Sequence, residues 1–429
     1  MQTVNQAAKT ATSAPDVVTL AKRAKAAAPV IANLSTDKKN AVLQRVARAL
    51  SSTASQAILD ANQQDMQVGR DKGLSAAMLD RLRLDQSRLE GISQAIEAIV
   101  LLPDPVGEVL NLHTAPSGIE IGRMRIPLGL ILIIYESRPN VTADAAALCL
   151  KSGNACILRG GSESLNSNRA LASVFADAFK AEGLPAEAVT LVPITDRQAM
   201  LELLRLNGII DLVIPRGGEQ LIRYVAENAR IPVVQHYKGV CHVYVDAEAD
   251  FDMAEQIVLN AKVQRPGVCN SMETLLIDRT CAKVFLPRIV AALRGKGVEI
   301  RGDAAVKTLV PDVHAATDAD FDTEHLDLIV SMALVDGLDG AIAHIAQHGS
   351  NHTEAIITTN QAKAARWVRE VDASCVLVNA STRFNDGGQL GLGAEIGIST
   401  TKMHAYGPMG LEELCALKWI GYGTGQVRT

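Results

Sequence analysis

From residue 128 onward the chain alternates short, continuously apolar segments with longer segments of helical periodicity, and this pattern constrains its fold more than any other feature. The apolar segments of the first series span residues 128–136, 154–161, 188–194, 209–218 and 231–236. The helical patterns between them span residues 142–153, 167–183 and 218–229. Strands that are apolar on both faces are typical of parallel sheets covered by crossover helices. The pattern therefore predicts an α/β fold, in which ligands bind at the carboxyl ends of the strands.

A second series of the same kind follows residue 246. Its predicted strands span residues 272–277, 328–335, 354–359 and 375–380, and its predicted helices span residues 250–264, 280–295 and 361–371. Ahead of both series, residues 16–100 are mostly helical in pattern, and the stretch 103–127 is punctuated by proline and glycine like a hairpin. We therefore expect two parallel-sheet domains joined to a small hairpin element.

Composition excludes several classes of function. The 429 residues are 48% hydrophobic and 21% charged, as in a soluble globular protein, and the formal net charge of −5 gives no basic footprint for nucleic acid. The longest apolar run, residues 128–134, is far too short to span a membrane. Seven cysteines without C-x-x-C spacing indicate reduced thiols and a cytoplasmic location. The start of the chain faintly resembles a transit peptide, but residues 16–34 have helical spacing, so we expect a folded helix there.

Two predicted strands end in the same tripeptide, Arg-Gly-Gly. The first is Arg159, Gly160 and Gly161, and the second is Arg216, Gly217 and Gly218. Glycines at a strand-to-helix turn let backbone N–H groups approach an anion, and a guanidinium adds attraction. Either turn alone could be an ordinary connection, but two of them favour a site for nucleotide phosphates. The segment 391–397 resembles a dinucleotide fingerprint only superficially, because its spacing is wrong.

Three histidines, His344, His348 and His352, are spaced by four residues, which raises the question of a metal site. The first two would share a helix face, but Gly349 is expected to end that helix. Neither carboxylates nor cysteines cluster with them, so we expect no metal and instead a packing or substrate-facing role.

Cys269 differs from the other cysteines because it lies in a segment of turn-forming residues, between Pro266-Gly267 and Asn270-Ser271. It is either a small loop residue or a nucleophile held in the open. A nucleophile must be a thiolate, and either Arg265 or a nearby helix end would lower the pKa of the thiol. A serine hydrolase has less support, since the chain contains no G-x-S-x-G elbow.

Long and specific segments at residues 102–109, 126–164, 264–271, 341–359 and 393–411 carry a family resemblance. On these residues the chain resembles the gamma-glutamyl phosphate reductase family of the aldehyde dehydrogenase superfamily, from its first helices to its end. The resemblance implies NADPH-dependent reduction of L-glutamate 5-phosphate to glutamate 5-semialdehyde with release of phosphate, the second step of proline synthesis from glutamate. It also implies a homo-oligomer in the cytoplasm, with the glutamate 5-kinase that supplies the substrate as a partner.

The fold implied by the resemblance is aldehyde dehydrogenase-like, with two Rossmann-like parallel-sheet domains and a small oligomerisation element. The expected boundaries are residues 1–110 and 128–245 for the cofactor-binding domain, 246–400 for the catalytic domain, and 111–127 with 401–429 for the oligomerisation hairpin and tail.

The resemblance also assigns roles to single residues. Cys269 matches the catalytic cysteine, and Asn140 matches the asparagine whose amide joins the cysteine's backbone N–H in the oxyanion hole. Both Arg-Gly-Gly turns and Glu324 match cofactor-binding positions. For the substrate's amino and carboxylate groups the resemblance assigns no residues. Our candidates there come from the loop 348–354 and the glycine-rich tail, namely His348, Ser350, His352 and Glu395.

One departure from the superfamily pattern bears on mechanism. Relatives that hydrolyse a thioester carry a general-base glutamate where this chain has His236. Without that base, a thioester on Cys269 is expected to receive hydride rather than water. His236 is then a candidate to deprotonate Cys269. Two competing functions remain open: a CoA-acylating aldehyde dehydrogenase, which would also lack the base, and a nucleotide-binding regulatory protein with a dead site.

Overall fold

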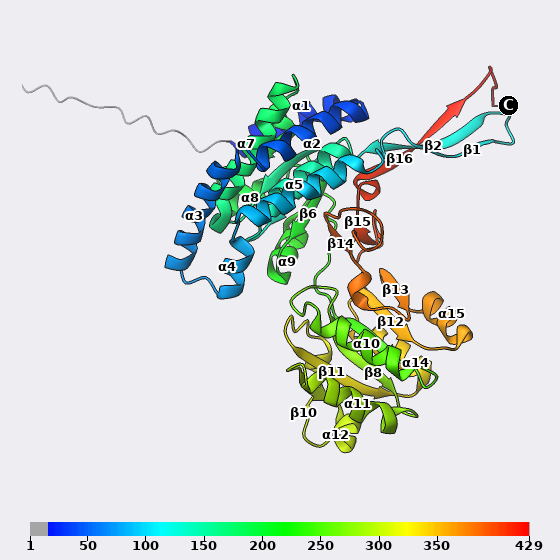
Figure 1. The fold of residues 1–429 in the computed structure, drawn as a ribbon. Helices are drawn as coiled ribbons and strands as arrows, with labels where there is room; N and C mark the ends of the chain where they lie inside the picture. The colour runs from blue at the N-terminus through cyan, green and yellow to red at the C-terminus, as the bar shows by residue number, and fades with distance from the viewer. Residues whose placement is uncertain (1–15, 429) are drawn as a thin grey trace, which may run out of the picture. The chain divides into compact units, whose positions relative to one another are not determined.

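The computed structural model describes residues 16–428 and divides the chain into two compact units. Unit 1 contains residues up to Ile214 together with Glu227–Val233 and Ala416–Thr429, and unit 2 contains Pro215–Ala226 and Val234–Cys415. Each unit has its own sheet system, coloured along the chain in Figure 1. In the described part of the chain, no helix has the length and apolar character needed to cross a membrane.

Unit 1 begins with a layer of helices whose starts are set by polar caps. The helices are α1 (Val17–Ala32), α2 (Thr36–Leu50), α3 (Ser55–Asp71), α4 (Ala76–Leu82) and α5 (Gln86–Leu101). Asp16, Ser35, Ser75 and Asp85 each accept a hydrogen bond from a backbone N–H of the first turn, which satisfies a donor that would otherwise be orphaned. The helical expectation for residues 16–100 is thus confirmed.

The sheet of unit 1 has four strands in the order β5-β4-β3-β6, and the two pairs β3–β4 and β4–β5 are parallel. The strands are β3 (Leu130–Tyr135), β4 (Ala155–Arg159), β5 (Val189–Leu191) and β6 (Leu212–Arg216). The connecting helices are α6 (Asn140–Lys151), α7 (Leu165–Ala181) and α8 (Arg197–Leu204), with short 3-10 turns at Ser162–Ser164 and Ala186–Ala188. The helix that follows β6, α9 (Glu219–Asn228), belongs mostly to unit 2. All six residues of β3 are fully buried, as a strand covered on both faces requires.

A second sheet in unit 1 joins segments from the two halves of the sequence. The hairpin β1 (Val109–Thr114) and β2 (Glu120–Pro127) is antiparallel, and β16 (Cys415–Tyr422) pairs beside β2 in the order β1-β2-β16. The predicted hairpin and the C-terminal tail therefore form one three-stranded sheet, visible in Figure 1.

Unit 2 is built around a seven-stranded sheet in the order β10-β9-β11-β8-β7-β12-β13, with parallel pairing throughout. Its strands are β7 (Cys241–Val245), β8 (Met272–Asp278), β9 (Glu299–Gly302), β10 (His314–Ala315), β11 (Ile329–Val335), β12 (Thr353–Ile357) and β13 (Cys375–Val378). Its helices are α10 (Phe251–Val263), α11 (Ala282–Arg294), α12 (Ala304–Leu309), α13 (Asp318–Phe321), α14 (Gly337–His348) and α15 (Gln361–Glu370). The remaining elements are the 3-10 turns η3 (Thr382–Phe384) and η4 (Glu412–Leu414) and the antiparallel pair β14 (Gly397–Ser399) and β15 (Gly407–Met409).

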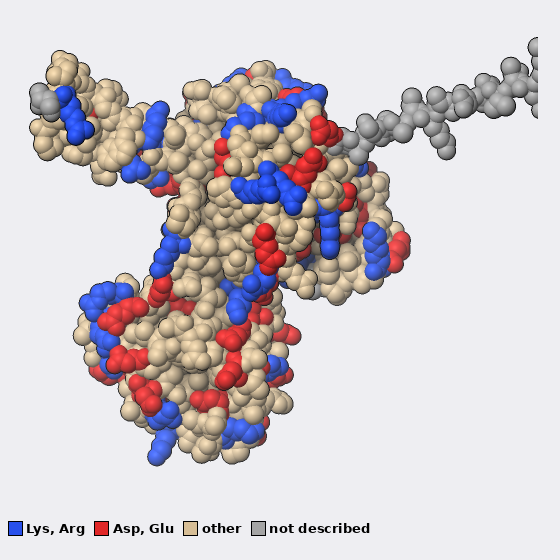
Figure 2. All heavy atoms as spheres, turned by 180° about the vertical axis from the view of Figure 1, so that it is seen from behind, with Lys and Arg blue, Asp and Glu red and all other residues tan. Residues whose placement is uncertain are grey.

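Two apolar clusters fill the faces of this sheet. One cluster places α10 and α11 residues such as Val258 and Phe285 against β8, and the other stacks Trp367 of α15 on Tyr244 of β7. Both faces are thus covered by helices, as the unbroken apolar strands require. On the face drawn in Figure 2, basic and acidic side chains are intermingled, in agreement with the lack of a basic footprint.

Two sequence expectations differ from the structure. Residues 231–236 form no strand, and Val233 makes only an isolated bridge to Val213. The expected boundary at residue 245 also lies later than the observed one, because β7 pairs with β8 and β12 in the middle of the second sheet. A buried apolar strand has the same sequence pattern in either sheet, so the pattern alone did not reveal with which strands β7 would pair.

Candidate active site

Cys269 lies on a tight turn between the end of α10 and the start of β8. The turn is closed by a hydrogen bond of 3.0 Å from Ser271 N–H to the Val268 carbonyl. Cys269 itself is half-buried, whereas five of the other six cysteines are buried and only Cys375 is comparably placed. The turn predicted from the sequence therefore places the Cys269 side chain at the rim of unit 2 rather than in its core.

A glycine approaches the backbone of this turn closely. A Cβ atom at Gly239 would lie 2.0 Å from the Cys269 carbonyl oxygen and 3.0 Å from its Cα. Since such distances are excluded for any real side chain, only glycine fits at position 239. The segment 236–241 therefore supports the Cys269 turn from beneath, backbone against backbone.

The groups around Cys269 gather at the amino ends of the parallel strands of unit 2. Cys241 is the first residue of β7, and its thiol donates to the Cys269 carbonyl at 3.1 Å. His352 directly precedes β12, and its Nδ1 lies 3.6 Å from the Cys241 sulfur and 2.7 Å from the Thr353 hydroxyl. In unit 1, by contrast, Arg159 ends β4, so there the carboxyl-end rule describes the candidate site.

His236 lies beside this cluster, with its ring 5.8 Å from that of His352. Burial, together with the neighbouring positive charge of Arg216, lowers the pKa of His236 to about 4. An imidazole with so low a pKa is a weak acceptor for the proton of a thiol. The suggestion that His236 deprotonates Cys269 is therefore disfavoured by the environment of the ring.

The helix that leads into the Cys269 turn presents its carboxyl end to it. α10 ends at Val263, six residues before the cysteine, and the carboxyl end of a helix carries partial negative charge. The end of α10 is therefore not the source of positive charge considered from the sequence. Activation of Cys269 by Arg265 stays a prediction.

Glu324 is half-buried and accepts a hydrogen bond from the backbone N–H of Gly239. Burial raises its pKa, and the negative charge of Glu219 adds to the rise. Gly239 thus contacts both Glu324 and the backbone of the Cys269 turn. Its predicted contact with a cofactor ribose stays a prediction.

The loop candidates for substrate binding are mostly engaged in packing. His348 is buried, with Nδ1 2.9 Å from an Asp322 carboxylate oxygen and its ring 4.6 Å from that of His344. The Ser350 hydroxyl accepts from the Val240 N–H at 2.9 Å, and Glu395 accepts from the Gly387 N–H at 2.9 Å. The packing interpretation of the histidines agrees with these contacts. Their roles in substrate binding stay predictions.

Asn140 begins α6 in unit 1, where its amide nitrogen donates to the Asp144 carboxylate at 2.9 Å. This bond orients the side chain across one helical turn and uses one of the two amide hydrogens, which leaves the second for another acceptor. Because Asn140 belongs to unit 1 and Cys269 to unit 2, their pairing in an oxyanion hole stays a prediction.

The first Arg-Gly-Gly sequence forms the expected strand-to-helix turn, from β4 into α7. Arg159 donates to the Thr195 carbonyl at 2.6 Å, while its buried Nε has no hydrogen-bond partner in the described part of the chain. A Cβ atom at Gly160 would lie 2.1 Å from the Asn168 amide nitrogen, so any larger residue there would require the Asn168 side chain to move. The turn therefore holds an unpaired, buried donor at the carboxyl edge of the sheet.

Sequence reasoning missed Glu163, which lies in the same turn. Its carboxylate accepts from both the N–H and the hydroxyl of Ser137 at 2.7 Å. Burial alone would raise its pKa, but these hydrogen bonds lower the pKa overall, so Glu163 is an anion beside Arg159. The signal was its position two residues after Gly161, in a turn where we considered only positively charged side chains.

The second Arg-Gly-Gly sequence has a different environment. Gly217 and Gly218 are exposed between β6 and α9, while the Arg216 side chain lies against Gly397, 3.3 Å from where a Cβ would project. The charge of Arg216 lowers the pKa of His236, and it opposes the rise that burial produces in the pKa of Glu395. Arg216 thus faces the glycine-rich tail. Its contact with a pyrophosphate stays a prediction.

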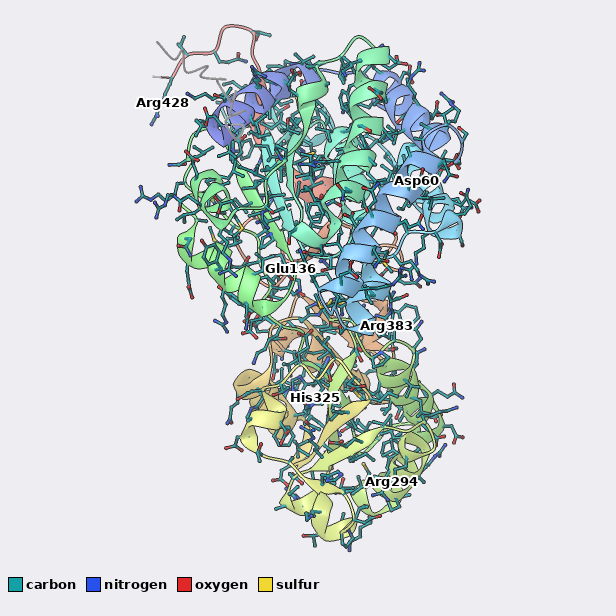
Figure 3. All side chains as sticks on the ribbon, turned by 90° about the vertical axis from the view of Figure 1, so that its left-hand side faces the viewer. Asp60, Glu136, Arg294, His325, Arg383 and Arg428 are labelled. Atoms are coloured by element: carbon teal, nitrogen blue, oxygen red, sulfur yellow. The ribbon has the colours of Figure 1, made fainter. Side chains whose placement is uncertain are left out.

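A surface pocket of about 340 Å³ in unit 2 is remote from these groups. It is lined by Arg294, Glu299, Asp312 and His314 among others. Figure 3 shows Arg294 at the opposite end of this unit from Arg383, which contacts the Cys269 turn. Within residues 16–428 we find no group of three side chains able to hold a metal ion.

Comparisons with known proteins show which proteins the chain is similar to. The family model described as "Aldehyde dehydrogenase family" matches residues 2–309, more than half of the chain. The gamma-glutamyl phosphate reductase of Geobacter metallireducens is 54% identical over 97% of this chain and 100% of its own length.

Solved structures are similar over the same extent. The gamma-glutamyl phosphate reductase of Thermotoga maritima is 45% identical, with a TM-score of 0.95 over 97% of this chain and all of that one. An acetylating aldehyde dehydrogenase from Geobacillus thermoglucosidasius has a TM-score of 0.69 at 15% identity, covering 96% of this chain and 97% of that one. At that identity the second similarity concerns the fold alone.

Proposed function

Because the chain belongs to the aldehyde dehydrogenase family, and within it to the gamma-glutamyl phosphate reductases, we propose that it reduces L-glutamate 5-phosphate to L-glutamate 5-semialdehyde and releases phosphate. The observation that carries the proposal is the placement of Cys269, half-buried on a turn that Gly239 supports, with a neutral histidine where hydrolytic relatives have a glutamate. In this role the reaction is the second step of proline biosynthesis.

Cys269 performs the covalent step. Its thiolate attacks the γ-carbonyl, the carbon–sulfur bond forms, and the bond from carbon to the phosphate oxygen breaks, leaving a thioester. The second amide hydrogen of Asn140 and the backbone N–H of Cys269 stabilise the oxyanion that forms on the way. Hydride reduction then gives a thiohemiacetal, and its collapse releases the aldehyde and restores the thiolate.

Members of this family use a nicotinamide cofactor, and we propose NADP(H) for this chain. The buried, unpaired Nε of Arg159 and the narrow glycine turn beside it fit a polar group of a nucleotide, and the exposed backbone at Gly217 and Gly218 fits a phosphate. Glu324 would hold a ribose hydroxyl near the Cys269 turn. When bound, the cofactor supplies the hydride.

The environment of His236 explains why the thioester is reduced and not hydrolysed. A general base that activates water needs a pKa near the working pH, and burial lowers the pKa of His236 to about 4. Such an imidazole stays neutral and gains little by accepting a proton. The thioester therefore persists long enough to meet hydride.

The same proposal covers location and partners. We infer a cytoplasmic homo-oligomer assembled through the β1-β2-β16 sheet, supplied with its labile acyl phosphate by a glutamate 5-kinase. The exposed apolar side chains of that sheet support the assembly, since Trp419 is 66% and Leu112 is 49% exposed.

An assay of NADP reduction with glutamate semialdehyde and phosphate tests the function, run in parallel with NAD and with CoA in place of phosphate. Wild type is expected to require phosphate, and Cys269→Ala is expected to lose turnover while binding NADPH as wild type does. Cys375→Ala, which replaces the other half-buried thiol, serves as the control. Turnover with CoA and none with phosphate would assign the chain to the CoA-acylating enzymes, and substantial turnover by Cys269→Ala would remove the nucleophile.

A further inference from the structure

Two arginines lie next to the Cys269 turn without a carboxylate partner. Arg383, in η3, directs Nη1 to the Asn270 amide oxygen and donates from Nε to the Gln264 amide oxygen at 2.8 Å. Asn270 follows Cys269 directly, and Gln264 precedes it by five residues. The guanidinium is therefore held against both sides of the turn that carries the nucleophile, and Figure 3 labels it at that end of unit 2.

The Asn270 side chain that contacts Arg383 is itself held in place by hydrogen bonds. The Asn270 amide nitrogen donates to the Asn385 carbonyl at 2.9 Å, and the Asn385 amide donates to the Thr353 hydroxyl at 2.7 Å. Asn270 and Asn385 are both buried. These bonds fix the orientation of the guanidinium and leave its Nη2 without a hydrogen bond to any described residue.

Arg265 lies on the same turn, directly after Gln264, and its side chain is exposed. It is close enough that its positive charge, after burial, is the largest influence that lowers the pKa of Arg383. Neither guanidinium has a carboxylate oxygen within ion-pair distance among residues 16–428. Eleven other arginines do, for example Arg294 with Asp312 at 2.7 Å.

Two neighbouring guanidinium groups repel each other. The Asp386 carboxylate offsets part of this repulsion at Arg383 without forming an ion pair, and a doubly charged anion between the two arginines would remove the rest. Arginine is suited to this task because its planar fork binds phosphate oxygens in pairs. From these observations we propose that Arg265 and Arg383 form the subsite for the phosphoryl group of the substrate. The proposal rests on the function proposed above and adds which residues receive the leaving group.

Chemistry decides between the two anionic groups of the substrate. The phosphoryl group is attached through one oxygen to the carbon that Cys269 attacks, whereas the α-carboxylate lies at the far end of the carbon chain. A site whose residues flank and contact the nucleophile's own turn therefore fits the phosphoryl group. As the carbon–oxygen bond breaks, its electron pair leaves with phosphate, and the two guanidinium groups balance that charge. In reverse, they hold phosphate while its oxygen attacks the thioester and the thiolate leaves.

The test uses the full-length enzyme in the direction of semialdehyde oxidation. We expect Arg265→Gln and Arg383→Gln each to raise the KM for phosphate at least tenfold, with the KM for semialdehyde within twofold of wild type. Arg265→Lys is expected to recover part of the affinity. Arg294→Gln, which removes an exposed and ion-paired arginine at the other end of unit 2, is expected to change neither constant.

A second measurement does not depend on turnover. Inorganic phosphate is expected to slow alkylation of Cys269 by iodoacetamide in wild type and in Arg294→Gln, but not in Arg265→Gln. Because Arg265 is exposed and makes no hydrogen bond to a described residue, this variant is expected to fold even if Arg383→Gln does not.

The alternative outcomes are distinct. A raised KM for semialdehyde with an unchanged KM for phosphate would overturn the proposal and assign the arginines to the α-carboxylate. Unchanged constants, or equal protection by phosphate in Arg265→Gln, would also overturn it. If wild type shows no phosphate-dependent activity but phosphate still protects Cys269, the proposed function fails while the anion subsite stands.

Discussion

Single residues around Cys269 differ in protonation because they differ in burial and charge. Burial raises the pKa of Cys281 and of Cys375 to about 11, and it raises that of Cys241 strongly. These thiols stay protonated at neutral pH and are poor nucleophiles. Cys269, in contrast, is half-buried at the rim of unit 2, close to the positive charges of Arg265 and Arg383.

Asn140 tests the predicted oxyanion hole. Asn140→Ala is expected to lower kcat by about 10²–10³, since one oxyanion donor is worth roughly 2.7–4 kcal/mol. The measurement is kcat in the reductive direction, with circular dichroism to verify the fold. Asp144→Ala is the matched control, because it removes the partner that orients Asn140 but keeps the amide. We expect Asp144→Ala to lose less than tenfold, and equal losses would mean that Asn140 acts only by supporting its helix.

At the scale of elements, Gly239 joins the segment before β7 to the turn before β8. Gly239→Ala is expected to displace Cys269 and to reduce kcat by at least a hundredfold, because its Cβ would lie 2.0 Å from the Cys269 carbonyl oxygen. Gly91→Ala in α5 is the control, since a Cβ there meets nothing within 4 Å. That variant is expected to keep full activity and to gain about 0.5–1 kcal/mol of stability. Normal activity in Gly239→Ala would show that the turn tolerates movement.

A buried ion pair closes the base of the same turn. Lys262, near the end of α10, donates to Glu273 of β8 at 2.7 Å, and both side chains are essentially inaccessible. Above pH 7, where Glu273 is ionised, Lys262→Met is expected to lower the free energy of unfolding by about 3–5 kcal/mol, because it leaves a buried carboxylate unpaired. The double variant Lys262→Met/Glu273→Met is expected to recover most of that loss in urea denaturation. If the double variant recovered none of the lost stability, the two side chains would contribute to stability by more than neutralising each other's charge.

The same pair predicts a pH dependence of stability. Burial raises the pKa of Glu273 to about 7 in the folded state. Between about pH 4.5 and 7 the folded carboxyl therefore keeps a proton that the unfolded chain releases, so its contribution to stability falls as pH rises. Urea denaturation across this range is expected to show the fall in wild type and not in the double variant. A wild-type profile that rises across the window would contradict the raised pKa.

At the scale of the whole molecule, the β1-β2-β16 sheet leaves large apolar side chains exposed. Trp419 is 66% exposed, with the Arg123 guanidinium over its ring at 5.0 Å. If copies of the chain assemble through this sheet, Trp419→Glu is expected to reduce the mass measured by sedimentation to that of one chain. Val284→Glu, at a 68% exposed position on α11, is expected to leave the mass unchanged. A monomeric wild type would exclude this assembly.

The element pattern was readable from the sequence because burial on both faces leaves a local signature. β3, β8 and β11 are almost wholly buried and mostly apolar, and the sequence located all three. It failed at residues 231–236, where an apolar run forms no strand, and at β7, which pairs in the second sheet. Strand partners depend on contacts between distant segments, which periodicity does not encode.

The chain's own sequence determined the family and the layered α/β plan and predicted the nucleophile, since each follows from residues within one short segment or from long matching segments. Only the tertiary structure decided the state of the groups around Cys269. It surrounded His236 with apolar burial and Arg216, placed the carboxyl end of α10 ahead of Cys269, and brought Arg383 from more than a hundred residues away against Asn270. The pKa of a side chain and the balance of charge around it depend on all groups that are close in space. A sequence shows directly only which residues are neighbours along the chain.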